Sequence, residues 1–305
     1  MVSRRFFVVT CVLAMGCDPL DGGIVTAPDA GPASNPPKDG GPGPLDAASP
    51  EDAGLDALAP KDAGDASAFS CAPVTGAFDK TDWFAQGSAQ LMPAAVPPFA
   101  KLTSNGSQAG VVYWKEVPLP VTFTSKVDFR FAEASGTSGL TFIVGKWGTA
   151  NPPTPTAGAS GGSLAFCGLR GTFGAGYAVF IDAFDEQTAP ETAIGELRIA
   201  KLPIGDCTTN GPRLAVSRPT GLSAALRDTK THTLLVKYTD KGDGNATVEA
   251  AVDALTPLVY SGARQLVTGD PTYFGVGASS YGQGGTAVND TVSLFRVEDC
   301  TPRDR

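Results

Sequence analysis

The chain has 305 residues, with 23 Lys and Arg against 31 Asp and Glu, and a formal charge of −8. This acidic balance argues against a nucleic-acid-binding protein, which needs a basic face. A single histidine, His232, excludes a His-rich zinc site and leaves a Ser-His-Asp triad only one possible base. Gly and Pro contribute 37 and 25 residues, which indicates many turns or a disordered tract.

Residues 1–16 have the pattern of an export signal. Arg4 and Arg5 precede an apolar stretch, 6–15, that is too short to span a bilayer as a mature helix. The stretch is followed by Cys17 and resembles the bacterial lipoprotein lipobox, although Leu13 lies one place earlier than usual. The resemblance implies lipidation at Cys17 and an anchor in the bacterial cell envelope, at the periplasmic face of the outer membrane or at the cell surface. An ordinary secretory signal is the alternative.

Residues 17–68 are expected to form a disordered acidic linker. From residue 18 onward this tract has no aromatic residue, nine prolines, and ten acidic residues against two lysines. It buries too little apolar surface to offset the entropy of ordering, and its charge and prolines favour an extended chain. Such a spacer after a lipobox resembles those of myxobacterial surface lipoproteins. A folded domain over 69–301 and a short tail, 302–305, follow it.

The folded part has the pattern of an all-β protein. Residues 126–131 alternate strictly between apolar and polar, which predicts a strand with one buried face. Further strands are predicted at 111–114, 140–144, 177–184, 233–238, 247–252, 273–279 and 291–297. One helical turn is predicted at 222–227. Many short strands with glycine-rich connections favour an antiparallel β-sandwich of jelly-roll type.

Four cysteines lie in the predicted domain and allow three pairings. Cys71 and Cys300 bracket the domain, and the termini of sandwiches often lie side by side, so we expect the pair Cys71–Cys300. This leaves Cys167–Cys207 as the second pair. The alternative, a four-cysteine metal site, lacks the usual Cys-x-x-Cys spacing.

Segments 138–144, 161–166, 177–184, 232–238 and 274–297 resemble, in this order, strands and loops of the L-type (legume-type) lectin domain. That domain belongs to the concanavalin A-like lectin/glucanase superfamily. The resemblance implies a sandwich that binds carbohydrate through loops at one rim. The positions that it assigns to sugar contacts are Ser138, Glu186 and either Gly161 or Gly162, with a plain tight turn as the alternative for the glycines. In the last glycine-rich loop, Tyr281 is a candidate for stacking on a sugar ring and Gln283 for bonding a hydroxyl, with a simple hairpin closure as the alternative. Ser138 stands where the lectins have Asp. Trp147 is a further candidate for stacking on a sugar, with a core role as the alternative.

The resemblance also implies a calcium site at the end of the 177–184 strand. Asp182 matches the calcium-binding Asp, with Glu186, the Phe184 carbonyl and Asp185 as further oxygen ligands. Phe180 replaces the Glu that binds a transition metal in the lectins, so that second metal site is expected to be absent. The alternative for 182–186 is a solvated acidic loop without Ca²⁺.

The glucanases of the same superfamily carry Glu-x-Asp-x-x-Glu with two catalytic carboxylates. Here Phe180 and Asp185 occupy the two end positions, which argues against that enzyme. His232 lies at a strand start with no nucleophile motif nearby, which favours a structural role. We therefore expect a non-catalytic, lipid-anchored protein that binds carbohydrate or another cell-surface component. The alternatives are a structural or adhesion lipoprotein without sugar binding and a divergent glycosidase.

Overall fold

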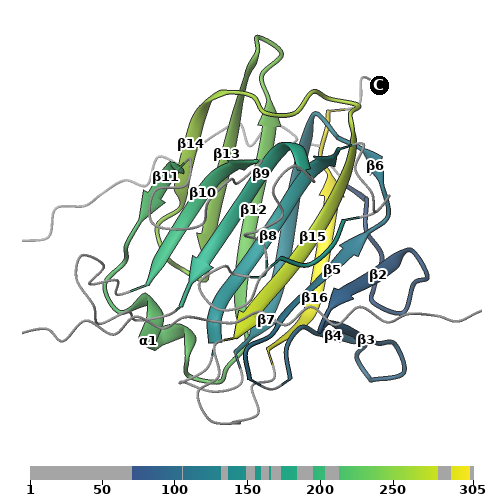
Figure 1. Cartoon of the computed structure of the whole chain (residues 1–305). Helices are drawn as coiled ribbons and strands as arrows, with labels where there is room; N and C mark the ends of the chain where they lie inside the picture. The colour runs from purple at the N-terminus through teal and green to yellow at the C-terminus, as the bar shows by residue number, and fades with distance from the viewer. Residues whose placement is uncertain are drawn as a thin grey trace, which may run out of the picture. The chain divides into compact units, whose positions relative to one another are not determined.

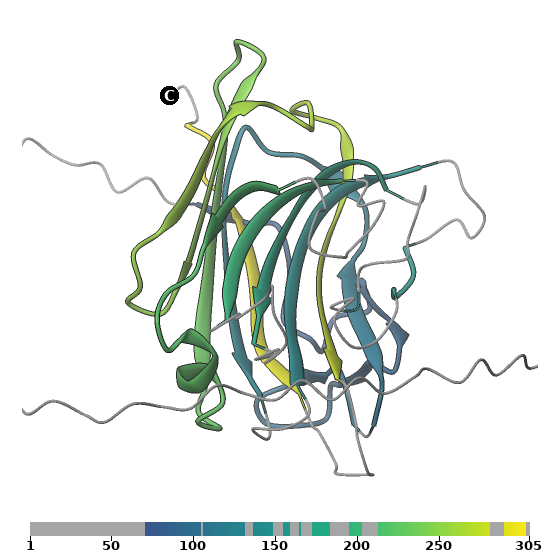
Figure 2. The same ribbon diagram turned by 60° about the vertical axis from the view of Figure 1, so that its left-hand side comes forward.

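The computed structural model describes residues 71–104, 106–131, 137–148, 155–158, 165, 173–183, 195–202, 213–280 and 290–302. Their strands form two antiparallel sheets that pack face to face (Figures 1 and 2). The expected all-β antiparallel sandwich is confirmed. Among the described residues, no helix is long and apolar enough to cross a membrane.

The sheet that we call the front sheet has its strands in the order β11-β10-β9-β8-β15-β5-β2, with β6 paired to β15. Their bounds are β2 (Trp83–Gly87), β5 (Ala109–Trp114), β6 (Val117–Pro118), β8 (Thr137–Trp147), β9 (Phe173–Asp182), β10 (Glu196–Leu202), β11 (Arg213–Ser217) and β15 (Pro271–Ser280). Neighbouring strands run in opposite directions, so both ends of the sheet carry strand starts and strand ends.

The back sheet has the order β14-β13-β12-β7-β16-β4-β3, with β1 paired to β16. Its bounds are β1 (Ala72–Pro73), β3 (Gln90–Met92), β4 (Phe99–Lys101), β7 (Thr122–Arg130), β12 (His232–Asp240), β13 (Asn245–Val252), β14 (Leu258–Ala263) and β16 (Thr291–Asp299). The single described helix, α1 (Leu222–Leu226), lies between β11 and β12 in the chain and confirms the predicted helical turn.

The hydrophobic core lies between the sheets because alternate residues of each strand point inward. Phe123 and Val127 of β7 meet Phe142 of β8 and Phe274 of β15 in this cluster. A second apolar cluster covers the opposite, outer face of the front sheet and includes Tyr113, Phe180 and Leu202. The front sheet is therefore apolar on both faces over part of its area, which is unusual for an antiparallel sheet that faces water.

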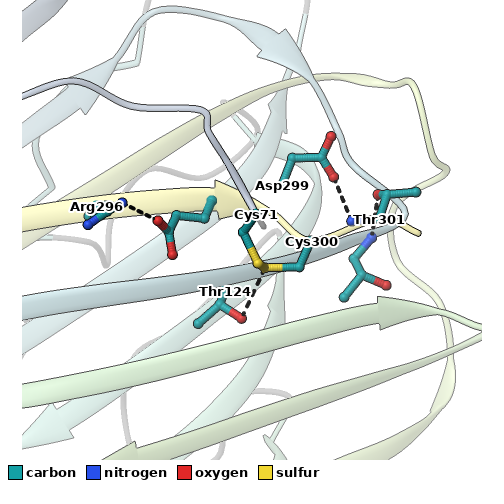
Figure 3. The surroundings of a disulfide bond; sticks show 8 residues. Cys71, Thr124, Arg296, Asp299, Cys300 and Thr301 are labelled. Atoms are coloured by element: carbon teal, nitrogen blue, oxygen red, sulfur yellow. Dashed lines mark hydrogen bonds and ion pairs between the residues drawn. A yellow bond between two sulfur atoms is a disulfide. The ribbon is translucent and has the colours of Figure 1, made fainter. Parts of the chain in front are cut away.

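The predicted disulfide Cys71–Cys300 is confirmed and joins the two ends of the domain (Figure 3). Beside it, β1 pairs with the end of β16, and the Cys300 N–H donates to the Thr122 carbonyl at 2.9 Å. The Sγ atom of Cys300 lies 3.8 Å from the hydroxyl of Thr124 on β7. The second predicted pair, Cys167–Cys207, lies outside the described residues.

Candidate functional site

The predicted sugar-binding and metal-binding positions gather at one end of the front sheet. Five strand termini meet there, because β8 and β10 begin, β9 and β15 end, and β5 begins at this edge. This edge, which we call the rim, lies at the bottom of the sheet in Figure 1. Segments that follow strand ends at such an edge are held by a rigid framework, which is the usual arrangement of binding loops.

Hydrogen bonds fix both ends of segment 281–289, which carries the candidates Tyr281 and Gln283. On one side, the buried Ser280 hydroxyl donates to the Gly106 carbonyl, and the Gln108 N–H lies 3.3 Å from the same hydroxyl. On the other side, buried Asp290 accepts a bond from the Thr103 hydroxyl at 2.8 Å. Tyr281 and Gln283 themselves lie outside the described residues.

Hydrogen bonds also fix the Ala183 end of segment 184–194, and close packing against α1 constrains its Gly195 end. The Ala183 N–H donates to the Ser138 carbonyl at 3.0 Å, and the Ala183 carbonyl accepts a bond from the Ser223 hydroxyl of α1 at 2.6 Å. Gly195, where the chain returns to the sheet, has φ +89, and a Cβ atom there would lie 2.9 Å from the Ser223 nitrogen. A glycine is needed at this position both for its backbone angle and for the close approach to α1.

Ser138 lies in the interior beneath the rim, with 1% of its surface exposed. It falls where the register between β8 and β15 shifts, opposite Ser279 and Ser280. Its hydroxyl oxygen is buried and has no hydrogen-bond partner among the described residues. Ser138 therefore lines the underside of the rim and does not present its hydroxyl at the surface.

Asp182, the candidate calcium ligand, is partly exposed at the end of β9 and pairs across the sheet with Gly139 and Glu196. The further candidate ligands Phe184, Asp185 and Glu186 lie outside the described residues, as do Gly161 and Gly162. Within the residues that the structure does describe, no group of three or more His, Cys, Asp or Glu could hold a metal ion.

The position of the lectin transition-metal ligand does not fit a metal. Phe180 is buried in the outer apolar cluster, and the guanidinium of Arg198 lies 4.6 Å from the centre of its ring. A phenyl ring offers no lone pair to a cation, and the neighbouring guanidinium would repel one. The side chain of Arg198 thus places a fixed positive charge beside this position.

Trp147, the further candidate for stacking on a sugar, does not lie at the rim. It is the last residue of β8, nine positions and roughly 30 Å along the strand from Ser138. Its ring packs edge-on against Phe173 at 4.8 Å, within the outer apolar cluster. Trp147 therefore lies at the other end of the sheet and cannot act together with the rim.

His232 begins β12 and is buried between two carboxylates, as its predicted structural role requires. Its Nδ1 lies 2.8 Å from Asp253, and its Nε2 lies 3.0 Å from Asp228. Hydrogen bonds from the Lys230 backbone and side chain hold the pKa of Asp228 at about 2. No nucleophile lies among the recorded hydrogen-bond partners of the histidine.

Sequence reasoning missed a charged cluster on the outer face of the front sheet, beside the rim. Glu196 at the start of β10 is surrounded by the side chains of Arg198, Arg213 and Arg218. A partial signal was the alternation in 196–199, where Leu197 and Ile199 enter the core while Glu196 and Arg198 lie on the other face; it gives no indication of Arg213 and Arg218. We name these four residues the arginine cluster.

Two cavities lie elsewhere in the described part of the chain. One, of about 350 Å³, is lined by Phe78, Pro97 and Phe295, and the other, of about 360 Å³, by Val96, Arg130 and Ser293. Neither is lined by a predicted site residue. Both border β16 of the back sheet.

No family model and no curated protein matches the chain. Among solved structures, the chain is similar to lectin I-B4 from Griffonia simplicifolia in its metal-free form. The identity is 15%, the match covers 73% of this chain and 97% of the lectin, and the TM-score is 0.52.

Two further similar structures score below that lectin. The carbohydrate recognition domain of Emp47p is 16% identical, with 72% and 89% of the two chains covered and a TM-score of 0.49. The exoplasmic/lumenal domain of VIP36 in its Ca²⁺/Man-bound form is 16% identical, with 73% and 85% covered and a TM-score of 0.48. The likeness to lectin I-B4 shows the fold, which is the concanavalin A-like sandwich of the L-type lectins.

Proposed function

We propose that this domain binds a saccharide at the rim of the front sheet. The observation that carries the proposal is that hydrogen bonds fix both ends of segment 281–289 and the Ala183 end of segment 184–194 at one edge, where β10 also begins its pairing with β9. These are the segments in which the lectin resemblance places sugar contacts. The fold shared with lectin I-B4, a protein named for carbohydrate binding, supports a saccharide as the ligand class.

The bound sugar is not cleaved, in this proposal. The two end positions of the glucanase motif are Phe180 and Asp185, and Phe180 is a buried ring without an acid or a nucleophile. A retaining glycosidase needs two carboxylates flanking the scissile bond. The protein therefore acts as a binding module that recognises a glycan or a glycan-bearing surface component.

The same proposal places the domain at a membrane of the bacterial cell envelope. Cleavage before Cys17 and lipidation of that cysteine would attach the chain, and the acidic proline-rich segment up to residue 68 would act as a spacer. Substitution Cys17→Ser should move the protein from the membrane fraction to the soluble fraction. An unchanged membrane fraction would contradict the lipid anchor and leave the binding proposal untouched.

A glycan array probed with the purified full chain tests the binding proposal. We expect a defined set of saccharides to bind, and Asp182→Asn to weaken binding because it removes a charged acceptor at the rim. Asp253→Asn, which changes a carboxylate beside His232, is the matched control. Loss of binding in chelator would show that a metal completes the site. Absence of binding on a broad array by the folded protein would refute the proposal.

A structural envelope protein without sugar binding is the second candidate. The burial of Ser138 favours it, because the residue that replaces the sugar-binding Asp of the lectins does not reach the surface. The same array distinguishes the two candidates. Release of free saccharide that Asp182→Asn abolishes would instead support a divergent glycosidase.

A further inference from the structure

The arginine cluster places three positive side chains around one carboxylate. Arg218 contacts Glu196 at 3.0 Å, while the closest approaches of Arg198 and Arg213 to the same carboxylate are both 3.6 Å. If all four side chains are charged, the cluster carries a net charge of +2. This excess of positive charge stands in a domain whose total charge is close to neutral, once the acidic linker and the signal are set aside.

Glu196 does not satisfy the hydrogen-bond donors around it. Both Nε and Nη2 of Arg218 donate to a single oxygen, Oε2, at 3.1 and 3.0 Å. The 3.6 Å contacts of the other two arginines are ion pairs beyond hydrogen-bond distance. The Nε of Arg213 is buried and has no hydrogen-bond partner among the described residues. At least one N–H donor of the cluster therefore has no acceptor among the described residues.

The strand register places the cluster on the outer face of the front sheet. Arg198 is paired with Phe180 of β9, and Glu196 with Asp182 at the rim. The intervening Leu197 points into the core between the sheets. The cluster therefore continues the rim sideways from Asp182 toward β11, on the face that the apolar ring of Phe180 also lines.

The cluster is partly withdrawn from water. The exposed fractions of the side chains are 8% for Glu196, 11% for Arg198, 25% for Arg213 and 52% for Arg218. The guanidinium of Arg198 also lies 4.6 Å from the centre of the Phe180 ring, a cation–π contact. An anion that approached from the side of the half-exposed Arg218 would accept hydrogen bonds from N–H groups of Arg218 and Arg213.

We propose that the arginine cluster binds the acidic group of a saccharide, a carboxylate or a sulfate, so that the rim selects acidic over neutral sugars. This inference rests on the saccharide-binding function proposed above and assigns its ligand class. Guanidinium groups suit this role because their planar forks donate two parallel hydrogen bonds to an oxyanion. The hydroxyl groups of the same sugar would lie toward Asp182 and the rim.

Three small probes test the cluster without knowledge of the full ligand. Glucuronate, inorganic sulfate and glucose are each titrated to about 50 mM, well above the roughly millimolar Kd expected for a single charged group, into the isotope-labelled full chain. We expect glucuronate and sulfate, but not glucose, to shift amide resonances of β10 and β11. Stronger binding of one of the two anions identifies whether a sugar carboxylate or a sulfate ester is the better ligand.

Variants then assign the binding to named side chains. Arg218→Gln and Arg213→Gln should each weaken anion binding about tenfold, since each removes a charge-assisted hydrogen bond. The anion affinity of Arg218→Lys should lie between that of the Gln variants and that of the wild type. Lysine keeps the positive charge but lacks the paired N–H donors of the guanidinium. The matched control is Arg296→Gln, a similarly exposed arginine on the back sheet that pairs with Glu298.

The outcomes separate this inference from the proposed function. No resonance shift by either anion, or shifts that Arg213→Gln and Arg218→Gln leave unchanged in folded protein, would overturn the anion site. Neutral glycans bound on the array together with that result would leave the saccharide function standing. Anion binding at the cluster with no glycan bound would instead overturn the saccharide function, and with it the acidic-sugar assignment.

Discussion

Asp240 and Glu196 are both buried carboxylates that contact arginine, but their surroundings are opposite. Asp240, at the end of β12, accepts bonds from one arginine, Arg264, at 3.0 and 3.1 Å, from the Thr268 hydroxyl at 2.8 Å and from the Gly242 N–H at 2.9 Å. Glu196 faces three arginines and accepts hydrogen bonds from one of them.

The difference indicates two purposes. At Asp240 one negative charge meets one positive charge and the donors around it are used within the fold, so the cluster stabilises the end of a hairpin. At Glu196 the positive charges outnumber the negative one and a buried donor remains unused among the described residues. We expect a cluster of the second kind to contribute less to stability and to have N–H donors available for an acceptor from outside the domain.

The largest effect is expected at Asp240. Asp240→Asn should lower the free energy of unfolding by about 3 kcal/mol, since it leaves the Arg264 charge partly buried without its partner. Urea unfolding at neutral pH measures this loss. Asp243→Asn, in the same turn but exposed, is the control and should lower the free energy of unfolding far less. Equal losses in the two variants would contradict the structural role of Asp240.

The pH dependence of stability gives a second test of the role of Asp240. Burial alone would raise the pKa of Asp240, but hydrogen bonds from Gly242, Thr268 and Arg264 together hold it below its usual value. A lowered folded pKa means that the stabilisation is fully present above about pH 4, the unfolded value, and is lost as the pH falls further. The stability difference between wild type and Asp240→Asn should therefore shrink as the pH falls from about 5 to about 2. A constant difference would contradict this sign.

Glu196→Gln should destabilise the domain less than Asp240→Asn, and an anion should reverse more of its loss of stability. We expect a smaller loss of about 1–2 kcal/mol, because water already reaches the half-exposed Arg218. Sulfate at about 50 mM should restore more stability to this variant than to Asp240→Asn, since an anion can replace the missing carboxylate. Because sulfate stabilises folded proteins in general, its effect on Asp240→Asn serves as the reference. Equal restoration would show that the arginine cluster has no particular affinity for anions.

The smallest effect on stability is expected at Arg218. Arg218→Gln should change the free energy of unfolding by less than about 0.5 kcal/mol, as for other exposed ion pairs. Thermal and urea unfolding measure it. A loss above about 2 kcal/mol would mean that Arg218 is chiefly structural.

The sequence predicted the strands whose two faces differ. Segment 126–131 alternates because one face enters the core, and 291–297 behaves in the same way, so both were found as parts of β7 and β16. The pair Cys71–Cys300 followed from the expected meeting of the termini. The strands β1, β3, β4 and β6 were missed, since two or three residues carry no periodicity and their pairing depends on distant partners. The longer strands β2, β10, β11 and β14 were missed as well.

The site was less predictable than the fold. Asp182 was found by resemblance, and the structure places it at the rim, but Ser138 lies in the interior and Trp147 at the opposite end of β8. The arginine cluster escaped notice because Arg213 and Arg218 come from β11 and its end, and only strand pairing brings them to Glu196. Charged residues far apart in a chain give no local signal of such a gathering.

A matched pair of oligosaccharides tests the central claim most directly. Isothermal titration of the full chain compares an oligosaccharide that contains a uronic acid with the same oligosaccharide after reduction of its carboxyl group. The account predicts binding of the acidic form at least about tenfold tighter, with this preference lost in Arg218→Gln and retained in Arg296→Gln. Equal affinity for the two forms, no binding of either across the uronic acids tested, or a preference that survives Arg218→Gln would contradict it.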